Sequence, residues 1–242
     1  MKRQIRRGVF ETNSSSQHSL CIMKNNEHYT PDEIARDFHL WDDKETGEKD
    51  CEWHIWDYDM EFGRSPFRAL GNFHDKWLYA CASLVCEYND ENYKKLEALA
   101  LKYVPGLKKI VVPMISDSVA DKNHPENKDS DYAEKYGKTE DEFNEWLEQK
   151  EKDWGIDTIE YWETDNGYFH FEKPCTGYVD VDILSGFLKK ENISLEEYLT
   201  NKKYVVIQDG DEYGYFGDMK RSGLINLDAI DHEYPRAYGT ED

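Results

Sequence analysis

The 242-residue chain lacks long apolar runs, and its cysteines are few and scattered. No stretch approaches the roughly 20 apolar residues that a helix needs to cross a bilayer. A basic start is present, but the apolar segment of a secretory signal does not follow it. Five cysteines are an odd number, which does not indicate a disulfide framework. We therefore expect a cytoplasmic protein with reduced thiols and no membrane partner.

Positive charge is also scarce. Thirty basic residues stand against 51 acidic ones, a net charge of −21. Such a charge repels nucleic acid and anionic membranes over most of the surface, which argues against a general nucleic-acid-binding module. Two interpretations remain open. The charge can serve solubility alone, or it can match the basic face of a protein partner.

Apolar residues make up 38% of the chain, a low share for a globular protein, whereas aromatic residues make up 14%, a high one. Disordered chains are poor in aromatics, so this composition favours a folded protein with an aromatic-rich core and long polar loops. The length suffices for one large domain or two small ones. We predict a single domain over residues 1–242.

Hydrophobic periodicity predicts an α+β fold, with a mixed or antiparallel sheet and several helices packed on it. The expected strands cover residues 2–10, 18–23, 52–60, 109–115, 158–162, 168–171, 203–208 and 213–216. The expected helices cover residues 31–38, 72–88, 90–104, 139–153, 179–189 and 194–200. Capping boxes are predicted at Thr139 with Glu142 and at Ser194 with Glu197. The sequence Asp165-Asn166-Gly167 predicts a hairpin turn.

Residues 116–138 are polar and acidic and show no helical or strand period. Long segments of this kind inside a domain are usually functional loops or linkers. We therefore predict a mobile acidic insertion here.

The most distinctive segment chemically is the basic, Ser-rich N-terminus. Arginine side chains and a row of hydroxyl and backbone N–H donors are suited to an anionic group such as phosphate. A histidine beside them can act as donor, acid or base near neutral pH. The candidate ligand-binding residues are Arg6, Arg7, Gly8, Thr12, Asn13, Ser14, Ser15, Ser16 and His18.

Three interpretations of this segment stay open. It can be a capped turn between two strands, with its arginines paired to nearby acids. It can be an anion-binding loop, although it lacks the Walker spacing. It can also hold a nucleophilic serine activated by His18, the one candidate catalytic residue, but no motif supplies a third residue to orient that histidine.

The other groups of potentially functional residues are better explained by structural roles. Cys51 and His54 form a single loose pair, whereas zinc sites normally need two tight ones. Acidic pairs such as Asp57 with Asp59 lack EF-hand spacing and are typical of turns. The seven tryptophans are interpreted as core residues. We predict neither a metal nor a cofactor.

The string RRGVFETNSSSQHSL, residues 6–20, resembles the opening of uncharacterised proteins from phages and mobile elements of Firmicutes. The shared motif positions are Arg7, Gly8, Glu11, Thr12, Asn13, Ser14, Ser15, Ser16, His18 and Ser19. This resemblance covers about fifteen residues. It implies a phage-borne accessory protein acting in the bacterial cytoplasm, and it implies no mechanism.

Three functions follow as hypotheses. The first is binding of a phosphate-bearing small molecule through the N-terminal Arg/Ser/His segment. The second is an acidic interaction protein that inhibits a basic host protein, such as a defence or nucleic-acid-binding factor. The third is a Ser/His hydrolase.

Overall fold

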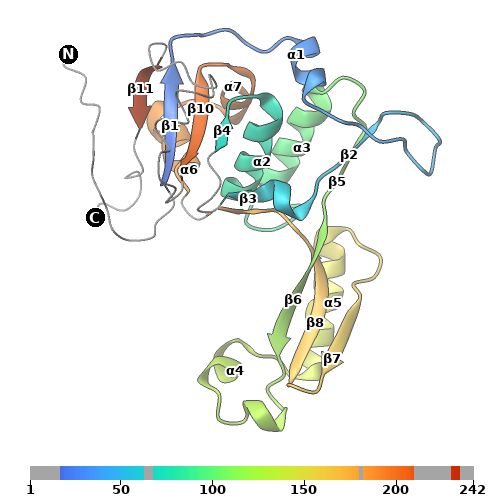
Figure 1. The fold of residues 1–242 in the computed structure, drawn as a ribbon. Helices are drawn as coiled ribbons and strands as arrows, with labels where there is room; N and C mark the ends of the chain where they lie inside the picture. Colours follow the sequence, from blue (N-terminus) through green and yellow to red (C-terminus); the bar gives the residue numbers. More distant parts are fainter. Residues whose placement is uncertain (1–16, 63–67, 180–181, 210–229, 235–242) are drawn as a thin grey trace.

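The computed structural model describes residues 17–62, 68–179, 182–209 and 230–234. The fold is α+β, as the sequence predicts. Figure 1 shows two parts: a body, in which helices lie beside a sheet, and an arm that projects from it. The arm comprises residues 114–174. Among the helices of the described ranges, none has the length and apolar character to span a membrane.

The body sheet has four strands, in the order β11 (Ile230–Tyr234), β1 (Gln17–Met23), β10 (Tyr204–Asp209) and β4 (Arg68–Leu70). All neighbours are antiparallel. The sequence predicts β1 and β10 correctly, because each carries a short apolar run. Leu20 and Val206, which are partners across the sheet, are fully buried.

Helices α2 (Phe73–Leu84) and α3 (Glu91–Tyr103) cover the middle of the body. Side chains of Asn72 and Asp90 accept hydrogen bonds from backbone N–H groups of their first turns, which fixes where each helix starts. The indole Nε1 of Trp77 donates to the carbonyl of Leu96 at 2.8 Å and joins the two helices. The core is aromatic, as the composition predicts. Its largest fully buried side chains include Trp77, Tyr79, Tyr93, Tyr198, Phe62 and Phe73.

Shorter elements complete the body. They are α1 (Pro31–Arg36), α6 (Leu184–Glu191) and α7 (Leu195–Thr200), and the parallel pairs β2 (Glu52–His54) with β5 (Lys109–Val111) and β3 (Glu61–Phe62) with β9 (Tyr178–Val179). The strand predicted over residues 52–60 ends at His54. The side chain of Asp59 accepts from the N–H of Trp56 at 3.1 Å and starts a 3₁₀ turn, η1 (Asp57–Met60), instead.

The arm is built from an antiparallel sheet in the order β6 (Met114–Ala120), β8 (Tyr168–Pro174) and β7 (Tyr161–Thr164), with α5 (Glu140–Trp154) on one face. The predicted capping box at Thr139 is present, and Gly155 ends the helix in the left-handed conformation. Phe143, Leu147 and Phe171 belong to a second cluster of buried residues, separate from that of the body.

Residues 116–138, which are predicted to form a mobile acidic insertion, contain regular secondary structure. Strand β6 pairs with β8 along its whole length, and α4 (Asp131–Tyr136) follows a 3₁₀ turn, η2 (Pro125–Asn127). Ser116 and Ser118 occupy alternate positions of β6, so the strand shows no apolar alternation on that face. The pairing partner lies some 50 residues further along the chain, and sequence-local patterns do not report it.

Three polar contacts connect the C-terminal end of α5 to the loop between α2 and α3. The Nδ2 of Asn89 donates to the carbonyl of Asp153 at 2.7 Å, and the Nε1 of Trp154 donates to Glu87 at 3.2 Å. Lys150 forms an ion pair with the same Glu87. The arm is therefore fixed to the body by side chains as well as by the chain crossings at its base.

Candidate functional site

Most of the sequence-predicted site lies outside the described residues. Arg6, Arg7, Gly8, Thr12, Asn13, Ser14, Ser15 and Ser16 all belong to residues 1–16. His18 lies in β1, where its backbone pairs with Gln208 of β10. The anion-binding loop and the Ser/His pair thus stay predictions.

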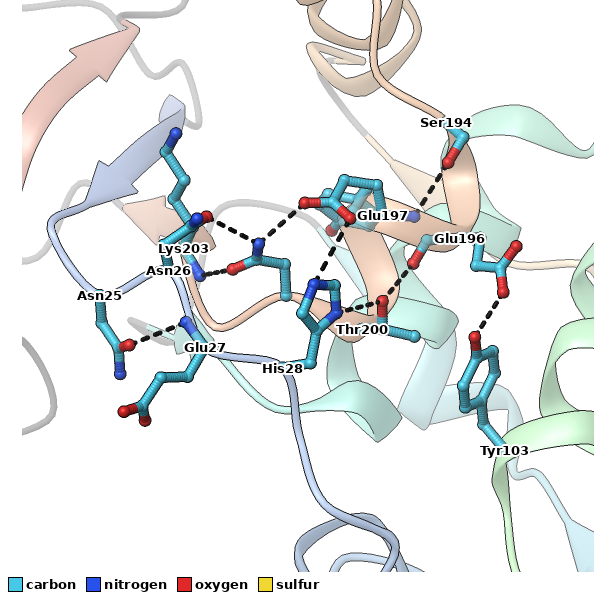
Figure 2. Close-up of polar contacts among 12 residues, drawn as sticks. Asn25, Asn26, Glu27, His28, Tyr103, Ser194, Glu196, Glu197, Thr200 and Lys203 are labelled. Carbon is cyan, nitrogen blue, oxygen red and sulfur yellow. Dashed lines mark hydrogen bonds and ion pairs between the residues drawn. The ribbon is translucent and has the colours of Figure 1, made fainter.

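A polar junction lies where the segment after β1 passes the end of α7 (Figure 2). Asn201 is its centre: its Nδ2 donates to Asn26 Oδ1 at 2.9 Å and to Glu197 Oε1 at 2.8 Å, and its Oδ1 accepts from the N–H of Lys203 at 2.8 Å. The residue is 1% exposed. Three hydrogen bonds satisfy this buried amide and join the end of α7 to the segment that follows β1.

The same junction holds a hydroxyl, an imidazole and a carboxylate in line. His28 Nδ1 lies 3.1 Å from Thr200 Oγ1, and its Nε2 lies 3.8 Å from Glu197 Oε2. However, the Thr200 hydroxyl donates its one proton to the carbonyl of Glu196 at 2.8 Å. His28 Nδ1 must therefore act as the donor to Thr200, the opposite of what a general base does. Thr200 is also 4% exposed, so this geometry gives a capped helix end and no nucleophile.

Beneath the junction lies a fully buried lysine. The Nζ of Lys76 donates to the carbonyls of Tyr198 at 3.0 Å and Asn201 at 2.8 Å, and it lies 5.0 Å from the ring centre of Tyr29. Burial lowers the pKa of Lys76 well below its ordinary value of 10.5, although Glu197 acts in the opposite direction. A lysine of low pKa can be a nucleophile. Here both contacts are carbonyls at the end of α7, which indicates a capping role.

The loose Cys51 and His54 pair does not converge. The Sγ of Cys51 faces the carbonyl of Glu48 at 3.6 Å, and His54 Nε2 lies 2.8 Å from Glu52 Oε2. Each side chain thus has its own separate partner, and the two do not form a joint site. Asp57 and Asp59 accept backbone N–H groups within η1, as acidic turn residues do. Within the described ranges, no group of three or more potential ligands could hold a metal ion.

The arm concentrates the negative charge of the molecule. Residues 114–174 hold eighteen acidic and seven basic residues, a net charge of −11, which is about half of the total in a quarter of the chain. On α5, Asp141, Glu145 and Glu148 occur at i, i+4 and i+7 and are all exposed. This acidic stripe lies opposite the buried face that carries Phe143 and Leu147.

The sheet of the arm has one face covered by α5 and one open face. Alternation places Phe169 and Phe171 toward α5 and His170 on the open side. Trp162 is the cross-strand partner of His170; the ring centres are 5.7 Å apart and the planes differ by 12°. Trp162 remains 43% exposed. The sequence does not reveal this pair as long as all tryptophans are interpreted as core residues.

The chain matches no protein-family model, and comparisons with curated proteins and with solved structures give no match either.

Proposed function

We propose that this protein is an acidic interaction protein, whose arm binds a positively charged surface of another macromolecule. The observation that carries the proposal is the position of the charge. A net charge of −11 belongs to a part that projects from the body, where a partner can reach it (Figure 1). In the bacterial cytoplasm that the N-terminal resemblance implies, a basic host protein is the partner that fits.

The acidic stripe is suited to long-range attraction. Asp141, Glu145 and Glu148 have no cationic partner among the residues that the structure describes. Three unpaired carboxylates on two turns of helix span about 10 Å. Such a field speeds the encounter with a basic face and falls off steeply as salt is added.

The arm also has a defined structure of its own, which favours binding. It has its own cluster of buried aromatic residues, and its helix is capped at both ends. Asn89 and Glu87 attach the end of α5 to the body. A pre-ordered surface loses less entropy on binding than a flexible acidic tail does.

The first hypothesis, binding of a phosphate-bearing small molecule by Arg6, Arg7 and the Ser-rich segment, competes with this proposal. A net charge of −21 repels such a ligand over most of the surface. It remains a proposal founded on the N-terminal residues alone, as does the Ser/His hydrolase.

A capture experiment tests the function. The full chain is immobilised and exposed to bacterial lysate at low salt, beside a variant with Glu140→Gln, Asp141→Asn, Glu145→Gln and Glu148→Gln. We expect the wild type to retain a discrete set of basic proteins that 0.5 M salt releases, and the variant to retain far less.

The matched control neutralises four exposed carboxylates of the body, at Asp32, Asp42, Glu45 and Glu91. This control has the same net charge as the arm variant. If both variants lose the captured proteins equally, the total charge is responsible and the arm is not a binding element.

A further inference from the structure

We propose that the open face of the arm sheet, centred on Trp162 and His170, binds an arginine side chain of a basic protein segment. This inference rests on the proposed function, because it names the partner chemistry of the same arm. Negative charge alone attracts any basic segment, whereas a contact with an arginine side chain would make the binding specific.

The platform is formed by strand register. His170 lies on the middle strand β8, with Trp162 opposite it on β7 and Ser118 opposite it on β6. These three side chains project from the same side of the sheet, away from Phe143 and α5. In Figure 1, α5 lies on one side of β8 and β7, and no described element covers the other side.

Trp162 packs against His170 and remains partly exposed. The imidazole of His170 lies nearly parallel to Trp162 with the ring centres 5.7 Å apart, so the two rings are offset and the imidazole covers only part of one indole face. Strand β7 is an edge strand, so no further strand of this sheet lies beyond Trp162. A large aromatic that is 43% exposed and already held in one orientation is suited to a planar ligand group.

Charge selects a cation among the planar groups. Glu172 follows His170 by two residues and shares its face, and the carbonyl of Glu160 accepts from the N–H of Glu172 at 3.1 Å. Neither the side-chain carboxylate of Glu160 nor that of Glu172 has an ion-pair partner among the described residues. A guanidinium stacks on an indole and at the same time offers a planar fork of N–H groups to a carboxylate. A lysine ammonium lacks that planar fork, and a nucleotide brings the wrong charge to an arm of net charge −11.

The test uses defined probes with the full chain. Fluorescent octa-arginine, octa-lysine and an eight-residue single-stranded oligodeoxynucleotide are titrated at 50 mM salt and followed by anisotropy. We expect the wild type to bind octa-arginine about two- to fivefold more tightly than octa-lysine, the range of an exposed cation–π contact. It should not bind the oligonucleotide.

The decisive variant is Trp162→Leu, which keeps an apolar side chain and removes the aromatic face. It should bind both peptides equally, with the weaker affinity of octa-lysine. The matched control is Trp56→Leu, because Trp56 is 50% exposed on the body and also stacks on a neighbouring ring, that of Tyr58. This control should keep the arginine preference. Circular dichroism checks that both variants are folded.

The outcomes separate the two proposals. If the wild type binds neither peptide, the proposed function fails. If it binds both but Trp162→Leu keeps the arginine preference, or Trp56→Leu loses it, the arm binds by charge and the platform is not the site. Preferential binding of the oligonucleotide overturns the assignment of a protein partner.

Discussion

The Nζ of Lys76 on α2 lies 2.8 Å from the carbonyl oxygen of Asn201, the residue that caps the end of α7. It also reaches the carbonyl of Tyr198 at 3.0 Å. A single buried amine thus satisfies two carbonyls that the helix itself leaves without donors. Through it, the core helix α2 supports the whole junction between β1 and α7.

Replacing Lys76 with methionine tests this role. The variant keeps the volume and removes the donor, so the carbonyl of Tyr198 loses its partner and that of Asn201 keeps only the N–H of Tyr204, at 3.4 Å. We expect the free energy of unfolding to fall by about 1–3 kcal/mol. Urea denaturation measures it. Lys95→Met is the matched control, because Lys95 is an exposed lysine on α3 whose change should lie within about 0.5 kcal/mol. An unchanged midpoint for Lys76→Met would contradict the capping role.

The same lysine predicts a pH dependence. Burial lowers the pKa of Lys76 in the folded protein below 10.5, so the unfolded chain binds more protons than the folded one in the range below that value. Between the lowered pKa of Lys76 and 10.5, the contribution of this residue to the free energy of unfolding therefore rises with pH, by up to about 1.4 kcal/mol per pH unit.

The comparison is made between pH 7 and pH 9, below the titration of unfolded tyrosine. The difference in unfolding free energy between the wild type and Lys76→Met should grow with pH, because only the wild type releases this proton on folding. A difference that stays constant or shrinks would mean that the buried amine keeps its charge in the fold.

Local sequence signals predict the helices, strands and turns well. Features that depend on contacts between residues distant in sequence are not predicted. Thr139 with Glu142 and the Asn166-Gly167 turn are decided within a few residues, and both predictions are confirmed. Lys76 instead depends on a carbonyl 125 residues away. Nothing around it in the sequence distinguishes a capping lysine from an exposed one.

The same distinction applies to the candidate site: one part follows from the local sequence, and the other depends on the pairing of two strands. The charge of α5 can be read directly from the sequence. The Trp162–His170 platform requires the register of β7 on β8. The predicted hairpin turn implies that register, since a turn at residues 165–167 places residues 162 and 170 opposite each other. The pairing of Trp162 with His170 is not expected when every tryptophan is interpreted as a core residue.

The turn of the arm hairpin offers a second stability test. Gly167 has φ +77°, and an added Cβ would lie 2.6 Å from the ring of His124. Gly167→Ala should therefore suffer both backbone strain and a clash, and we expect a loss of about 2–4 kcal/mol. Hydrogen exchange of residues 161–174 should accelerate with it.

Gly155 provides the control for strain alone. Its φ is +67°, but no atom lies within 4 Å of an added Cβ. Gly155→Ala should cost only about 1 kcal/mol. Equal losses for the two variants would show that His124 moves aside freely and that η2 does not pack against the turn.

The attachment of the arm depends on Asn89, which has φ +67° and donates to the carbonyl of Asp153. Asn89→Gly keeps this backbone conformation easily and removes only the hydrogen bond. We expect a small change in global stability, below about 1.5 kcal/mol, with faster hydrogen exchange confined to the last turn of α5. Exchange that accelerates throughout the body would contradict a local contact.

The N-terminal hypothesis is tested by titration calorimetry of the full chain against a panel of nucleotides. If Arg7 contributes a charged hydrogen bond to a phosphate, Arg7→Ala should weaken binding about 10- to 100-fold. Arg36→Ala, which removes the same charge from the last turn of α1, should leave the affinity within about twofold. This pair matters because the chain carries a net charge of −21, so any lost arginine weakens anion binding slightly through the overall field. Only a loss specific to Arg7 separates a direct phosphate contact from that background, and a wild type that binds no phosphorylated ligand rejects the hypothesis.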